Sequence, residues 1–172
     1  MITVMLKNFN MFDENFELSQ GLYDDCLSQV DINSLSCSCS QSHCLHKHGY
    51  YLRKIRTTHG LINLKILRVK CACCGRTHAI MLSCIIPFSQ FLLNQMLKMI
   101  KTPISALNYF LITFNIDDSH VRYIKKMFHL HWKECLDNFN SSFNEHLSSF
   151  CFRHLQCQFM QIRALSNIAF YL

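Results

Sequence analysis

The chain has 172 residues, half of them apolar, and a formal net charge of +6 from 17 Lys and Arg against 11 Asp and Glu. This length suffices for one ordinary domain or two small ones, and the scarcity of Gly and Pro (4 and 2 residues) argues against low-complexity disorder. No signal peptide is expected, and the longest apolar run, residues 79–100, is interrupted by Pro87 and several amide side chains, so we expect a cytoplasmic protein without a membrane span.

Charge is unevenly distributed along the sequence. Residues 32–116 contain ten Lys and Arg and no Asp or Glu. An acid-free basic block of this length is typical of proteins that bind a polyanion, most often nucleic acid. We therefore expect double-stranded DNA as a partner. The competing interpretation is a solvated basic face on an otherwise unrelated domain.

Two runs rich in β-branched and aromatic residues, 50–57 and 61–70, predict a β-hairpin. Gly60 lies between them and permits the positive φ of a hairpin turn. The sequence THAIML, residues 77–82, indicates another strand. Such a hairpin brings the residues that precede it and those that follow it to the same end of the ribbon.

One cysteine-rich group lies just before the predicted hairpin, and a second lies just after it. The second, KCACCG, has the spacing Cys71-x-x-Cys74 followed by Gly75, in which a tight turn directs two thiolates to one ion and backbone N–H groups to the sulfurs. The first group, Cys37, Cys39 and Cys44, lacks the C-x-x-C spacing, and His43, His46 and His48 lie near it as substitute ligands. A ribbon this small buries too little apolar surface to fold stably without a bound ion. We predict a closed, structural Zn²⁺ site with four ligands, made of Cys71, Cys74 and two of Cys37, Cys39 and Cys44, with Cys73 as a bystander.

A redox role for the C-x-x-C pair is the competing interpretation, although a thioredoxin-like pair would be followed by a helix and not by a strand. The central region has no carboxylates for a metal-dependent nuclease, and no nucleophile signature supports a Cys–His pair. We therefore expect a binding protein and not an enzyme. The remaining cysteines lie among apolar residues, and we expect them to be small side chains of the core: Cys26, Cys84, Cys135, Cys151 and Cys157.

The period of the apolar residues becomes helical in the second half of the chain. Helices are expected at 88–100, 104–114 and 118–139, with Asn115 or Asp117 supplying the turn and N-cap before the third. The second and third have the proportions of a helix-turn-helix. The basic ribbon and the outer face of the third helix give these expected DNA contacts: Arg53, Lys54, Arg56, Arg68, Arg76, Ser119, Arg122, Lys125 and Lys126.

Together these elements predict an α+β fold, a small β zinc ribbon followed by an α-helical, helix-turn-helix-like region. The expected segments are an N-terminal extension (1–35), a zinc-ribbon domain (36–86) and a helical domain (87–172) with the helix-turn-helix at about 104–130.

One run carries a family resemblance: HGYYLRKIRTTHGLINLKILRVKCACCGRTHAIMLSCIIPFSQ. Together with VRYIKKMFHLHW and CFRHLQCQFMQI, it resembles a DUF6431-like family of small bacterial, transposase-like proteins that begin with a zinc ribbon. The resemblance covers roughly residues 35–165. It implies a DNA-associated accessory or remnant of mobile elements without an established reaction, and its ligands carry over onto Cys71 and Cys74. The irregular first group departs from a plain C-x-x-C, which leaves its ligands open.

These observations predict a zinc-dependent DNA-binding protein, associated with or derived from a transposase, without a catalytic centre of its own. The alternative is a zinc-ribbon module for protein–protein interaction that docks on a transposase or on the transcription machinery.

Overall fold

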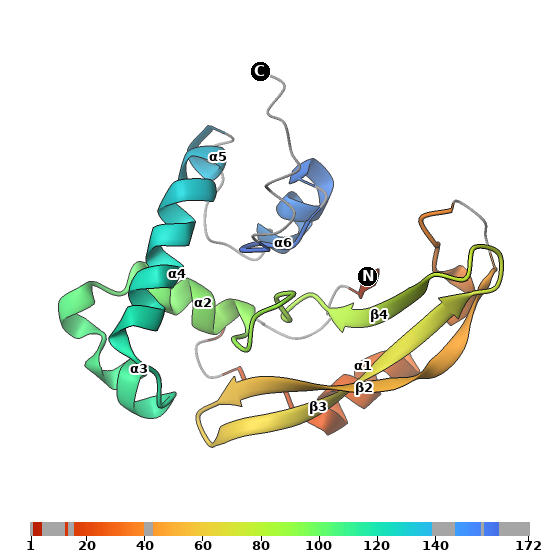
Figure 1. Cartoon of the computed structure of the whole chain (residues 1–172), viewed down its shortest axis with the longest axis horizontal. Helices are drawn as coiled ribbons and strands as arrows, with labels where there is room; N and C mark the ends of the chain where they lie inside the picture. Colours follow the sequence, from red (N-terminus) through yellow and green to blue (C-terminus); the bar gives the residue numbers. More distant parts are fainter. Residues whose placement is uncertain are drawn as a thin grey trace.

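The computed structural model describes residues 2–4, 13, 16–39, 43–138, 147–155 and 157–161. A four-stranded sheet with the strand order β1-β4-β3-β2 forms one part of the molecule, and most of the helices gather beyond the end of the sheet where the hairpin turn lies (Figure 1). The expected α+β class is thus confirmed. Among the described residues, no helix combines the length and the apolar character that crossing a bilayer requires.

The hairpin consists of β2 (Leu45–Thr57) and β3 (Gly60–Cys71), which pair antiparallel from Leu45 opposite Cys71 to Thr57 opposite Gly60. Gly60 follows the turn with φ 111° and Gly49 has φ 132° at a bulge in β2, values that side-chain-bearing residues rarely adopt. The predicted hairpin is confirmed, and β2 begins earlier than expected.

The N-terminal segment adds a strand to this sheet and a helix that packs against it. Strand β4 (Thr77–Leu82) pairs antiparallel with β3, and β1 (Ile2–Val4) pairs parallel with β4. Helix α1 (Gln20–Ser28) lies against the hairpin. The Tyr23 hydroxyl donates to Ile80 O (2.8 Å) and accepts from Leu67 N (3.0 Å), so this buried side chain ties β3 to β4 beyond their paired residues.

The second half of the described chain is helical. Its elements are α2 (Leu93–Lys101), η2 (Ile104–Ala106), α3 (Asn108–Thr113), α4 (Asp118–His131), α5 (Lys133–Asn138), α6 (Leu147–Phe150) and the π-helical turn η3 (Cys151–Leu155). Asn115 takes φ 45° in the turn before α4, and the Asp117 carboxylate caps α4 by accepting from Ser119 N at 2.7 Å. The long third helix that was expected is divided at the fully buried Trp132.

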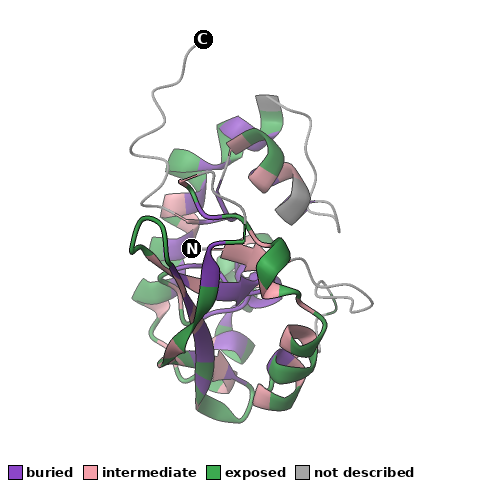
Figure 2. Cartoon of the chain, turned by 90° about the vertical axis from the view of Figure 1, so that its right-hand side faces the viewer, coloured by how far each residue is buried: buried purple, intermediate pink, exposed green. Residues whose placement is uncertain are grey.

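The apolar side chains of the described residues form two cores. The larger joins the N-terminal segment, the turn half of the hairpin and the helices; Leu18, Ile55, Leu64 and Trp132 are among its members. The smaller lies at the other end of the hairpin and includes Leu67, Val69 and Ile80 of β3 and β4 together with the cysteines 37, 44 and 71. Figure 2 shows the buried residues running through the interior of the molecule. The three segments expected from the sequence therefore share the larger core.

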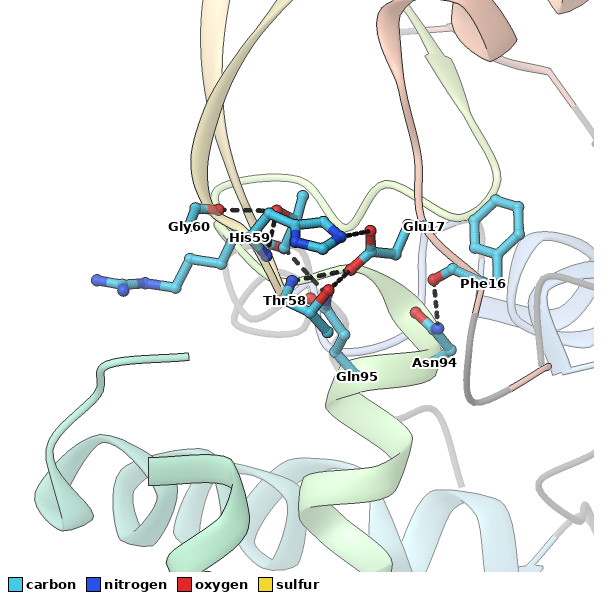
Figure 3. A network of polar contacts seen from close by, with 9 residues as sticks. Phe16, Glu17, Thr58, His59, Gly60, Asn94 and Gln95 are labelled. Carbon is cyan, nitrogen blue, oxygen red and sulfur yellow. Dashed lines mark hydrogen bonds and ion pairs between the residues drawn. The ribbon is translucent and has the colours of Figure 1, made fainter. Parts of the chain in front are cut away.

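A polar junction fixes the hairpin turn to the helices (Figure 3). The Glu17 carboxylate accepts from the backbone N–H of Thr58 at 2.8 Å and from its hydroxyl, and lies 3.9 Å from His59 Nε2. Gln95 of α2 donates to Arg56 O at 2.9 Å, and Asn94 donates to Phe16 O at 3.0 Å. The orientation of α2 relative to the hairpin is thus set by hydrogen bonds as well as by packing.

Candidate metal centre

Four cysteines meet at the end of the hairpin that lies away from α3 and α4 (Figure 1). Cys37 and Cys39 follow the short helix η1 (Ile32–Ser34), Cys71 is the last residue of β3, and Cys74 lies in the turn to β4. The hairpin returns the chain to this point, which is why residues more than thirty positions apart share one site.

The sulfur atoms are spaced as a single metal ion requires. All four lie within 4.8 Å of one another; Cys37 Sγ is 3.5 Å from Cys74 Sγ, and Cys39 Sγ is 3.7 Å from Cys71 Sγ. A tetrahedral ion with bonds of about 2.3 Å separates its sulfur ligands by about 3.8 Å. The group can therefore hold one metal ion without a large movement of the chain.

The turn between β3 and β4 has the geometry of a metal-binding knuckle. Gly75 adopts φ 71°, and its N–H donates to Cys71 O at 2.9 Å. The N–H of Cys74 points to Cys71 Sγ at 3.4 Å. The backbone thus turns two sulfurs to one side and supplies a donor to one of them, as the spacing predicted.

The clustered thiols differ in pKa, because backbone N–H donors lower the pKa of some, and burial and the neighbouring thiols raise that of others. The backbone N–H of Cys74 lowers the pKa of Cys71 to about 6, and that of Cys39 lowers the pKa of Cys37 to about 7. The Cys74 thiol receives a backbone hydrogen bond from Arg76, but burial and the neighbouring thiols outweigh it and raise its pKa to about 11. The cluster therefore holds thiolates at neutral pH, and a cation would remove the repulsion that keeps further thiols protonated.

Cys44 and Cys73 lie beside this group in different settings. Cys44 is buried with its Sγ 3.2 Å from Cys71 Sγ, and this contact, with burial, raises its pKa to about 12, so Cys44 is the protonated partner. Cys73 is exposed, and its sulfur lies within 4.8 Å of those of Cys44 and Cys71. A second, three-sulfur group thus shares Cys71 with the first.

His78 is a neighbour of the cysteine group that the sequence reasoning missed. It lies on β4 opposite Val69, is buried, and places Nε2 3.2 Å from Cys37 Sγ. The spacing could have indicated this position, because a His four residues after the second Cys of a knuckle lies on the strand that follows the knuckle. The three histidines of the first group that were considered as ligands, at positions 43, 46 and 48, are all exposed, and the two metal-competent groups among the described residues contain none of them.

A site of four thiolates has a limited chemistry. Tetrahedral sulfur ligation is typical of Zn²⁺ or iron. Four protein ligands leave no open position for water or substrate, so such an ion holds the chain together and does not activate a reactant. The scattered cysteines are core residues as predicted: Cys84, Cys135, Cys151 and Cys157 are buried, and Cys26 is partly buried.

Three of the basic residues expected to contact DNA donate hydrogen bonds to backbone carbonyls of the same chain. Arg53 Nη2 donates to Ile86 O and Ser89 O, both at 2.6 Å. Arg56 Nη1 donates to Phe114 O at 2.7 Å, in the turn before α4. Lys125 Nζ donates to Ile100 O at 2.9 Å and Thr102 O at 2.5 Å, and partial burial lowers its pKa. These three side chains fix the loops that surround α2 and α4.

The other expected contacts lie nearer to solvent. Lys54, Ser119 and Lys126 are exposed, and Arg68 is half-buried. Arg76 Nη1 donates to Ser38 Oγ at 3.0 Å. Arg122 pairs with Asp118 at 2.6 Å one turn earlier on α4, an exposed pair of the kind that contributes little to stability.

A comparison with known protein families supports the resemblance drawn from the sequence. Residues 30–110 match a family described as a domain of unknown function (DUF6431), a little under half of the chain. The match begins a few residues before Cys37 and ends within α3, so it contains the hairpin, all four clustered sulfurs and α2. The curated proteins and the solved structures yield no match.

Proposed function

We propose that the four-sulfur group binds one Zn²⁺ and that the protein is a zinc-dependent DNA-binding protein without a catalytic centre. The sulfur spacing and the thiolate character of Cys37 and Cys71 support a metal with tetrahedral sulfur ligation, and Zn²⁺ is the common redox-inert ion of that kind. Cys37, Cys39, Cys71 and Cys74 are the proposed ligands. Cys44 and His78 support the sulfurs by hydrogen bonding.

The observation that carries the DNA-binding proposal is the exposed polar face of α4, a helix joined to the neighbouring elements by hydrogen bonds. Val121, Ile124 and Phe128 point inward, while Arg122 and Lys126 are exposed. Arg56 fixes the turn that precedes α4, and Lys125 fixes the helix to the end of α2. A basic helix face braced in this way suits a helix-turn-helix, in which phosphate contacts hold the recognition helix in the major groove.

The surface charge of the ribbon extends this proposal. Lys47, Lys54, Lys65 and Arg76 are exposed on or beside the hairpin, within the stretch that contains no acidic residue. Phosphate contacts by such residues supply affinity without sequence preference. The ribbon would hold the duplex backbone, and α4 would provide the contacts to bases. The family resemblance adds to this proposal an association with mobile elements.

Salt-titrated binding of a labelled duplex of random sequence tests the proposal. Each neutralised phosphate releases counterion, so the affinity of the zinc-loaded protein should fall steeply with salt. The double variant Arg122→Ala/Lys126→Ala should bind more weakly and reduce the slope of log affinity against log salt by about 2. Lys133→Ala, on the exposed start of α5, is the matched control and should leave the slope unchanged. Absent or salt-independent binding would contradict the proposal.

The second candidate is a module for protein–protein interaction, in which zinc organises a surface that docks on a transposase or on the transcription machinery. The observation that favours it is the exposure of large apolar side chains on α3 and α4: Tyr109, Ile112 and Leu130 are 65%, 81% and 61% exposed. Under this candidate Ile112→Glu abolishes co-purification with such a partner, whereas Arg122→Ala/Lys126→Ala does not.

A further inference from the structure

Strand β2 forms an edge of the sheet whose outer side is only partly covered. Within the described residues β2 pairs with β3 alone. Near the hairpin turn its outer side is satisfied, because Arg56 N donates to Gln90 O at 2.8 Å and Arg56 O accepts from Gln95 Nε2 at 2.9 Å. Further along the strand this cover ends.

The backbone groups of Tyr50, Leu52 and Lys54 point outward from this edge. In a β-strand the N–H and C=O of one residue point to the same side, and successive residues alternate. Because both groups of Arg56 point away from β3, those of Lys54, Leu52 and Tyr50 do so as well. In the described part of the chain none of these three backbones has a hydrogen-bond partner outside the hairpin ladder. An open edge of this length is a template for another strand.

The side chains along this edge frame a cavity. Tyr50 stands opposite Leu67 and Leu52 opposite Lys65, so all four project to the face that carries α1. Between α1 and the hairpin lies a cavity of about 670 Å³, to which Tyr50 and Leu52 contribute. Both are largely exposed, at 50% and 68%. The apolar part of the lining comes from Leu27, Val30, Ile32, Leu67 and Ile80.

The rim of the cavity is basic. Lys47 and Lys65 line it, with Lys65 Nζ 4.7 Å from the centre of the Tyr50 ring, and Lys54 follows on the same edge. Asp24 is the one acidic residue of the lining, and Gln20 Nε2 donates to it at 2.9 Å. A second copy of β2 is a poor occupant, because the strand carries six Lys, Arg and His residues and no acid. A nucleic acid strand cannot form a ladder of N–H and C=O bonds.

We propose that the β2 edge binds an extended acidic peptide segment of a partner protein by β-strand addition. The outward N–H and C=O groups of Tyr50, Leu52 and Lys54 form the ladder. An apolar side chain of the peptide enters the cavity beside α1, and Asp or Glu residues flanking it meet Lys47, Lys54 and Lys65. This surface does not include α4, but it shares Lys47, Lys54 and Lys65 with the ribbon face proposed above to contact phosphates, so peptide binding and duplex binding are measured separately.

Fluorescence anisotropy with labelled peptides of about eight residues tests the proposal on the zinc-loaded full chain. The probes carry a central Ile with Glu alternating with Thr on both sides, and the control peptides carry Lys in place of Glu. The acidic peptides should bind the wild type, and the basic ones should not. Leu52→Pro removes an outward N–H, which an edge strand tolerates, and should weaken binding about tenfold. Leu52→Val keeps that N–H and should bind as the wild type does. Lys47→Gln/Lys65→Gln should bind more weakly at low salt.

Amide hydrogen exchange of the wild type covers the case in which Leu52→Pro does not fold. The acidic peptide should slow exchange at Tyr50, Leu52 and Lys54 and leave Ile112 unchanged. The proposal is overturned if no acidic peptide binds, if basic peptides bind equally, or if exchange at the edge is unaffected. A dimer that Leu52→Pro converts to a monomer, or a loss of duplex binding without loss of peptide binding in that variant, also overturns it, because a second copy or nucleic acid then occupies the edge.

Discussion

Cys37 Sγ lies 3.5 Å from Cys74 Sγ, although 37 positions of sequence separate the two residues. The β-hairpin between them accounts for this closeness, since its antiparallel ladder extends from Thr57 opposite Gly60 to Leu45 opposite Cys71, with one bulge at Gly49. A metal ion at this place would close the open end of the hairpin. The turn end is closed by the polar junction with α2.

Serine substitutions of the four cysteines should separate ligands from neighbours. Cys37→Ser, Cys39→Ser, Cys71→Ser and Cys74→Ser are each expected to lower the zinc content measured by elemental analysis, because a hydroxyl replaces a thiolate ligand. Cys73→Ser, on an exposed side chain in the same turn, is the matched control and should keep one zinc per chain. Equal zinc content in all five variants would show that the metal lies elsewhere.

The structural consequence of metal loss should be local. The smaller core surrounds the cysteines, whereas the larger core holds α1, the turn half of the hairpin and the helices without any of the proposed ligands. In Cys74→Ser, amide exchange is therefore expected to accelerate at the Cys71 end of β3 and in β4 and to stay slow in α4. Acceleration throughout the chain would mean that the two cores are one cooperative unit.

His78 should tune the affinity for the metal without being a ligand. Its Nε2 lies 3.2 Å from Cys37 Sγ on a buried part of β4, so it orients that sulfur. His78→Ala is expected to keep one zinc per chain at saturation while lowering zinc affinity by about 10- to 100-fold in competition with a chelator. Loss of zinc at saturation would instead make His78 a ligand.

Acidification should release the metal in a graded way. Without metal, the pKa values of Cys37 and Cys71 are about 7 and about 6. Above about pH 7 these two sulfurs are mostly thiolates, and zinc displaces few protons from them; as the pH falls below about 6, zinc has to displace a proton from each. Zinc affinity should therefore fall more steeply with decreasing pH below 6 than above 7. A constant slope across this range, measured by chelator competition, would contradict the role of the two thiolates.

The neighbours Lys125 and Lys126 should differ in stability and in DNA binding. Lys125 donates to two carbonyls at the end of α2, whereas Lys126 is exposed. Lys125→Ala is expected to lower the free energy of unfolding by about 1 kcal/mol, the usual effect of losing a cation at a helix C-terminus. Lys126→Ala should leave the unfolding free energy unchanged and weaken duplex binding. The reverse assignment would show that α4 is oriented differently.

Strand pairing and the cysteine groups were predictable because their signals are local. β-branched runs around a glycine specify the hairpin, and the C-x-x-C-G spacing specifies the turn after β3. The hairpin, the strand at Thr77–Leu82 and the N-cap at Asp117 follow from such patterns. The sequence also restricted the first pair of sulfurs to Cys37, Cys39 and Cys44, which are the three that lie near Cys71.

Contacts between distant segments were not predictable in the same way. Arg53 and Arg56 lie in the acid-free basic block and Lys125 lies on the basic helix that follows it, and nothing in their spacing shows that each finds backbone carbonyls to bind. The role of Tyr23 between β3 and β4 likewise depends on where α1 packs. A charged side chain on a strand looks the same in sequence whether it binds a partner or a loop of its own chain.

X-ray absorption spectroscopy of the wild type purified with its metal tests the central claim most directly. The account predicts one zinc per chain with four sulfur neighbours at about 2.3 Å and no nitrogen or oxygen in the first shell. A wild-type protein that takes up no zinc, or a zinc shell that contains nitrogen or oxygen atoms, would contradict it.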